Sequence, residues 1–117
     1  GRGNEAKAKA FLAQAEKADP RNEKGVLAGA YSALADLYRE KEQYDKAMPL
    51  SQKALAAAKK PDETADARIG LAICHALGKR DLGESAREAK AVLAMKDAPE
   101  GARKMAQRIL DWIQRQK

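Results

Sequence analysis

The side chains of this sequence that could do chemistry are few and stand apart from one another. His75 and Cys74 are the single histidine and the single cysteine of 117 residues, and neighbours on a helix point about 100° apart, so they cannot form a catalytic dyad. Gly70 and Gly78-Lys79 are too widely spaced for a phosphate-binding loop. One cysteine excludes an internal disulfide and a cysteine-based zinc site. We therefore expect no catalytic, cofactor-binding or metal-binding residues and predict that the chain is not an enzyme.

The charge of the chain is basic, with 23 lysines and arginines against 17 aspartates and glutamates. The excess is densest near the C-terminus, in a stripe that opposes only one aspartate: Arg103, Lys104, Arg108, Arg115 and Lys117 against Asp111. Such a stripe could attract nucleic acid or anionic lipid. Aromatic residues, on which bases would stack, make up only 4% of the chain, so the sequence favours a solvated face.

The composition is that of a folded protein rather than a disordered or membrane-spanning one. Apolar residues make up 44% and charged residues 34%, and the longest uncharged stretches (25–35 and 69–78) are shorter than the ~20 residues of a transmembrane helix. The lone cysteine slightly favours a cytoplasmic location, and the periplasm is the alternative if a signal peptide has been removed. The opening Gly1-Arg2-Gly3 is expected to be an internal cut or a cloning remnant.

Apolar residues recur at helical spacing throughout, and no alternating run predicts a strand. We expect six helices, over residues 4–18, 22–41, 44–60, 62–78, 82–96 and 97–117. Their predicted N-caps are Asn4, Asn22, Asp45, Asp62 or Thr64, Asp81 and Asp97, and Gly78 is expected to end the fourth helix in a left-handed conformation. Phe11 and Met105 are expected on buried stripes. The connections are short, so consecutive helices should be antiparallel.

An internal repeat organises these helices into pairs. Ala8, Ala47 and Ala86 are each separated by 39 residues, and a second set (Ala15, Ala54 and Leu93) follows seven residues later. Self-similarity at this period is typical of a solenoid, in which each helical hairpin buries its face against the next.

The middle unit resembles the tetratricopeptide repeat. The resemblance is carried by Tyr31-x2-Leu34-Ala35-x2-Tyr38, then Tyr44-x2-Ala47, then Ala54-Leu55. Ser51 and Lys59 depart from the pattern, which usually has an aromatic residue and a proline there. The resemblance implies one all-α domain over residues 1–117, a short right-handed α-solenoid. Its parts would be the second helix of a partial repeat (4–20), a repeat (22–60), a degenerate repeat (62–96) and a capping helix (97–117) in which Trp112 packs.

The resemblance also implies a function. In this family the first helix of each hairpin lines a concave groove that binds a segment of another protein, so the register predicts a partner-binding set: Ser32, Asp36, Arg39, Glu40, Arg68, His75 and Lys79. Ser32 and Asp36 stand where the subset that grips chaperone tails has lysine and asparagine, which argues against that ligand. The alternatives are a basic module that binds nucleic acid, a helper domain cut from a larger protein, and self-association through the uncapped N-terminal helix.

Overall fold

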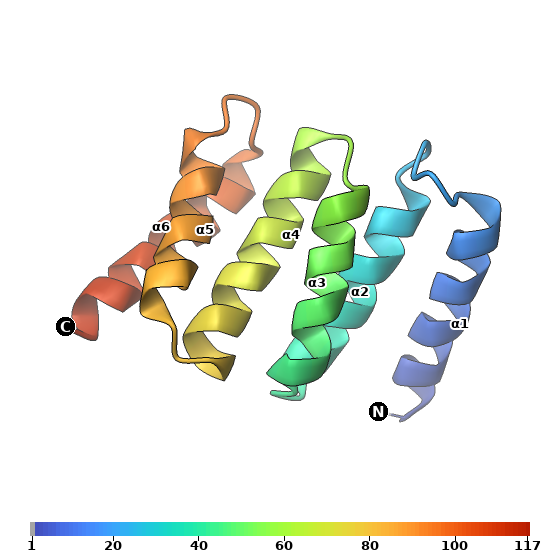
Figure 1. Cartoon of the computed structure of the whole chain (residues 1–117), viewed down its shortest axis with the longest axis horizontal. Helices are drawn as coiled ribbons and strands as arrows, with labels where there is room; N and C mark the ends of the chain where they lie inside the picture. The colour runs from blue at the N-terminus through green and yellow to red at the C-terminus, as the bar shows by residue number, and fades with distance from the viewer. Residues whose placement is uncertain (1) are drawn as a thin grey trace.

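Six α-helices run in chain order across the molecule, as a computed structural model of residues 2–117 shows (Figure 1). They are α1 (Arg2–Ala18), α2 (Val26–Glu40), α3 (Tyr44–Ala57), α4 (Pro61–Ile73), α5 (Leu82–Ala94) and α6 (Glu100–Arg115), with a π-helical turn η1 (Cys74–Gly78) directly after α4. Consecutive helices are antiparallel, and α2 and α6 lie behind α3 and α5 in this view. The described residues therefore confirm the predicted all-α class with six helices, and the expectation about Gly1 lies outside them.

Helix α4 is the centre of this arrangement. Each helix packs against its neighbour in the chain, and α4 also packs against α2 and α6, which are two places away. The positions of α4 that face its neighbours are small: Ala65, Ala67, Gly70 and Ala72 are all buried. Small side chains are needed there because backbones that approach from several sides leave no room for larger ones.

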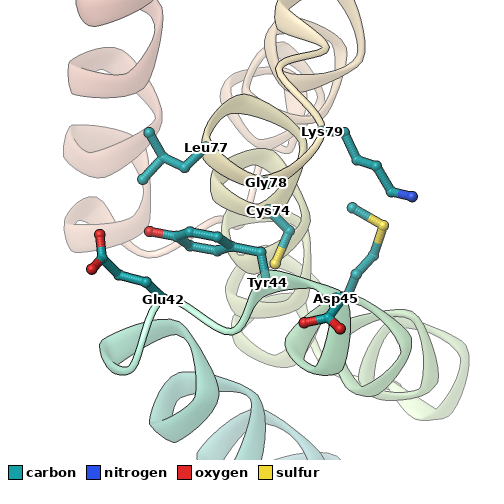
Figure 2. Close-up of a pocket in the computed structure, with 8 residues that line it drawn as sticks. Glu42, Tyr44, Asp45, Cys74, Leu77, Gly78 and Lys79 are labelled. Atoms are coloured by element: carbon teal, nitrogen blue, oxygen red, sulfur yellow. The ribbon is translucent and has the colours of Figure 1, made fainter.

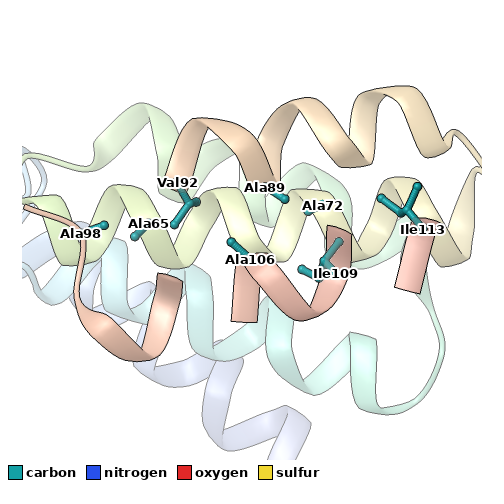
Figure 3. Packing of buried hydrophobic residues seen from close by; sticks show 8 residues of the cluster. All are labelled: Ala65, Ala72, Ala89, Val92, Ala98, Ala106, Ile109 and Ile113. Carbon is teal, nitrogen blue, oxygen red and sulfur yellow. The ribbon is translucent and has the colours of Figure 1, made fainter. Parts of the chain in front are cut away.

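The last three helices enclose a cluster of buried aliphatic side chains. Figure 3 shows Ala65 and Ala72 of α4 facing Ala89 and Val92 of α5 and Ala106, Ile109 and Ile113 of α6. Trp112 packs against this cluster and is partly buried, as predicted. Helix α6 thus covers the apolar face of the preceding pair of helices.

Several predicted helix ends were wrong. Helix α1 already includes Arg2, so Asn4 lies inside it and does not cap it, and α3 ends at Ala57 rather than Lys60. Pro61 does not merely end a helix: it is the first residue of α4, where its missing N–H leaves no hydrogen bond unmade. Lys60 before it is extended, as residues before proline tend to be, and becomes the N-cap in place of Asp62 or Thr64.

Of the three predictions about the helix ends around α5, one is confirmed and two were wrong. Asp81 caps α5 through a bond from the Glu84 N–H, as predicted. The left-handed residue after η1 is Arg80, with φ 56°, and not Gly78. Asp97 does not cap α6, whose N-cap is Pro99. Instead, the Arg103 guanidinium holds that loop by donating to the carbonyls of Leu93, Met95, Lys96 and Ala98.

The turn between α1 and α2 is built on two buried polar side chains. The Asp19 carboxylate accepts bonds from the N–H groups of Glu23, Lys24 and Val26. Asn22 does not begin α2, because its φ is 55° and the helix starts only after Gly25. Its Oδ1 nevertheless accepts from the Ala28 N–H, 2.9 Å away, and so satisfies an amide of the first turn of α2.

A substitution at Ala47 tests the register in which α2 and α3 pack. It is fully buried between α2 and α3, beside Ala35 and Tyr38. We predict that Ala47→Leu lowers the free energy of unfolding by about 1–3 kcal/mol, because added methyl groups must displace packed neighbours. Urea unfolding measures this effect, and Ala56→Leu on the exposed side of α3 is the matched control. Equal stability of the two variants would contradict the register.

A substitution at Asp19 tests whether its charge stabilises the turn between α1 and α2. Desolvation by burial opposes ionisation of Asp19, but the surrounding backbone N–H groups outweigh it and lower its pKa below the ordinary value of 3.8. Its ionised form therefore stabilises the fold above that value, and the contribution is lost as the pH falls through the folded-state pKa. We predict that Asp19→Asn melts below the wild type at pH 7 and that the difference shrinks toward pH 2. A difference that is the same at both pH values would show that the charge is irrelevant.

Candidate functional site

A polar hollow lies between α2 and α4. It has a volume of about 210 Å³ and is lined by Ser32, Asp36, Arg39, Ser51, Asp66 and Ile69. It therefore brings together three of the residues that the sequence predicts for partner binding, Ser32, Asp36 and Arg39. The other three lining residues come from α3 and α4 and were not predicted.

Arg39 is the organising side chain of the polar hollow. Its guanidinium pairs with Asp36, and only 17% of the Arg39 side chain is exposed against 59% for Asp36. Gly70 makes this position possible, since a Cβ there would lie 2.7 Å from Ser51 Oγ and 2.8 Å from Arg39 Nη1. The glycine leaves the space in which the guanidinium lies.

Carboxylates outnumber cations on this side of the molecule. Desolvation, and next the carboxylates of Asp36 and Asp62, raise the pKa of Asp66, against the opposing effect of Arg39. Among the side chains described, those of residues 3–117, Asp62 and Asp66 take part in none of the ion pairs. Both are exposed, so this face of α4 presents two carboxylates without an ion-pair partner.

An apolar hollow continues along the same side of α4. It has a volume of about 200 Å³ and is lined by Ile73, Ala76, Leu77, Arg108, Ile109 and Trp112. Leu77 is 43% exposed. It lies in the π-helical turn η1, whose residue spacing differs from that of α4.

The two hollows share one stripe of α4. Asp62, Asp66, Ile69 and Ile73 follow one another at intervals of three or four residues in α4, which places them on one helical face, and Leu77 of η1 joins Ile73 in the lining of the apolar hollow. Ile69 lines the polar hollow and Ile73, one turn on, lines the apolar one. We call this stripe, with the hollows along it, the α4 groove.

A third hollow, of about 290 Å³, lies between the start of α3 and η1 (Figure 2). Tyr44 lies beneath Gly78 there, and Cys74 points toward the tyrosine. Cys74 is fully buried, and burial raises the pKa of its thiol, so it stays protonated and behaves as the small hydrophobic residue that the sequence predicts. Lys79, a predicted binding residue, lines this hollow rather than the polar one.

The remaining predicted residues lie outside the three hollows. Glu40 is exposed at the end of α2. Arg68 pairs with Glu88 of α5 at 2.9 Å, and His75 is half-buried in η1. The α4 residues that do face Arg39 are Asp66 and Ile69, and the sequence signal for them was the spacing of the α4 stripe.

Two exposed apolar residues differ from expectation, whereas four of the five cations of the basic stripe are exposed, as expected of a solvated face: Lys104, Arg108, Arg115 and Lys117. Phe11 and Met105 are 48% and 39% exposed, so their predicted burial was wrong: α1 and α6 each lie at an end of the row of helices, where one side has no covering helix. In the basic stripe, Arg103 is engaged with loop carbonyls and Lys104 pairs with Glu100.

In comparisons with known proteins, no family model, no curated protein and no solved structure matches the chain. Among residues 2–117, no group of three or more histidines, cysteines, aspartates and glutamates could hold a metal ion. None of the helices in this range is both long and apolar enough to cross a membrane.

Gly78 tests the close approach of η1 to α3. A Cβ there would lie 2.5 Å from Tyr44 Cβ, an atom fixed to the backbone, so α3 or η1 would have to move. We predict that Gly78→Ala lowers the free energy of unfolding by about 1–3 kcal/mol. Gly29→Ala is the matched control. It meets no atom within 4 Å and should raise stability by about 0.5–1 kcal/mol. Calorimetry on both variants checks the contrast, which a stabilising Gly78→Ala would contradict.

Proposed function

We propose that the chain is a non-catalytic protein-interaction module that binds a segment of a partner protein along the α4 groove. The observation that carries the proposal is the α4 stripe itself, with a polar hollow and an apolar hollow on one continuous helical face. A tetratricopeptide-like scaffold would use the same side of its hairpins, the side formed by α2, α4 and α6.

The size and composition of the hollows favour a peptide segment as the ligand. Sites for small molecules typically enclose about 300–1,000 Å³, whereas the two hollows hold about 210 and 200 Å³. Each is thus suited to one or two side chains of a longer ligand. Partly exposed Trp112 is of a type that is enriched at interfaces, and exposed Leu77 lines the same hollow.

The mechanism of such a module is passive. The helices are fixed by packing on both sides of α4, so the groove is formed before a ligand arrives and little ordering of the receptor is needed. Affinity would come from the apolar contacts and selectivity from the charges around Arg39. Aromatic residues, on which bases would stack, make up only 4% of the chain, which favours a protein partner over nucleic acid.

Charge reversal at Arg39 tests the proposed function. We predict that Arg39→Glu weakens retention of a partner from a lysate of the source organism by about tenfold or more, because it replaces the guanidinium that pairs with Asp36 and so disrupts the shape of the polar hollow. The matched control is Arg87→Glu on α5, whose side chain is 78% exposed. Quantitative mass spectrometry of the retained proteins at near-physiological salt gives the ratio.

A second variant keeps the test independent of folding. Ser32 is only partly buried and lines the polar hollow, so Ser32→Tyr should fill that hollow without changing a charge. If both Arg39→Glu and Ser32→Tyr are folded by circular dichroism and retain the same proteins as Arg87→Glu, the groove is not the binding surface.

A further inference from the structure

The α4 groove changes character along its length. Its first half carries the exposed carboxylates of Asp62 and Asp66, and its second half carries Ile73 and Leu77. The carboxylate of Asp36 is close enough to Asp66 to contribute, after desolvation, to the raised pKa of Asp66. Asp36 itself is paired with Arg39. The unpaired charge of the groove is therefore negative at the start of α4 and positive beside Leu77, where Arg108 also lines the apolar hollow.

From this gradient we infer that the partner segment carries a basic side chain, which Asp62 and Asp66 bind, and a large apolar side chain that fills the apolar hollow. The inference rests on the proposed function, because it specifies the ligand of the same groove. It commits to a peptide segment of a protein as the occupant, and charge complementarity is the ground for it.

Two features of the aspartates support a cation as their ligand. They lie four residues apart on one helix, where like charges repel, and no ion pair among the described side chains of residues 3–117 relieves that repulsion. A lysine or arginine from a partner would supply the missing countercharge. The guanidinium of Arg39 does not supply it, because that group pairs with Asp36 and lies deeper, beside Gly70.

The length of the helix between the two halves sets the spacing in the ligand. Asp66 and Ile73 are seven residues apart, which is about 10 Å along a helix axis at 1.5 Å per residue. An extended peptide advances about 3.3 Å per residue, so its basic and apolar side chains should be about three or four residues apart. In a helical segment the same distance is about seven residues.

Selection from a random peptide library displayed on phage, with the whole chain as bait, tests the inference. The expected result is a set of peptides with lysine or arginine three or four residues from a large apolar residue, or seven if the peptide is helical. One selected peptide is then synthesised, and its dissociation constant is measured by fluorescence anisotropy against purified variants.

Two variants, each with a matched control, divide the groove into its halves. Asp66→Asn should weaken binding of the peptide about fivefold, and less at high salt, whereas Asp97→Asn on an exposed loop should not. Leu77→Ser should weaken it at least about tenfold, whereas Phe11→Ser, a similarly exposed residue of α1, should not. Because desolvation and the neighbouring carboxylates of Asp36 and Asp62 raise the pKa of Asp66, its ionised form opposes folding, and Asp66→Asn should melt no lower than the wild type.

The outcomes separate this inference from the proposed function. If the peptides carry no basic residue, or Asp66→Asn binds as tightly as Asp97→Asn while Leu77→Ser loses binding, the inferred ligand chemistry is overturned and the groove still binds a segment. If no peptide is selected, or if binding is the same in all four variants, both the ligand chemistry and the proposed function are overturned.

Discussion

The close approach of helices around α4 is the constraint on which the rest of the structure depends. Four helices pack against α4, and four of its five buried positions are alanine or glycine, with Leu71 as the exception, because closely approaching backbones leave little space. The chain then has few large apolar side chains with which to build a core, and it compensates with many small buried ones and with buried polar turns such as that of Asp19 and Asn22. A larger residue at a position such as Ala72 would disturb the packing against both α5 and α6.

The same constraint produces the α4 groove. A helix that is packed on several sides has one remaining face, and on α4 that face carries Asp66, Ile69 and Ile73. The π-helical turn η1 follows the stripe and carries exposed Leu77. Gly70 and Gly78 each leave room for a neighbouring side chain: Gly70 for Arg39 and Gly78 for Tyr44.

The all-α class and the six helices could be predicted from the sequence because they follow from apolar periodicity and from prolines and capping residues, which act locally. Capping at Asp81 was predictable for that reason, whereas Asn22 was wrong as a helix start because its side chain reaches an amide six residues away. Three of the groove residues could be placed through a single repeat register, but Asp66 and Leu77 could not. The spacing of the α4 stripe groups Asp66 with Ile69 on one face, but the helix that this face meets and the π-helical turn that contains Leu77 have no local sequence signal.

The most direct test of the account is the position at which a ligand touches the molecule. A photoreactive benzoyl-phenylalanine placed at Leu77 of the purified chain, in a lysate of the source organism at near-physiological salt, reports contacts within a few ångströms of the apolar hollow. The same group at Lys90, exposed on α5, is the comparison. The account predicts a discrete protein adduct from position 77 and none from position 90. Adducts from position 90 alone, or equally from both, would contradict it.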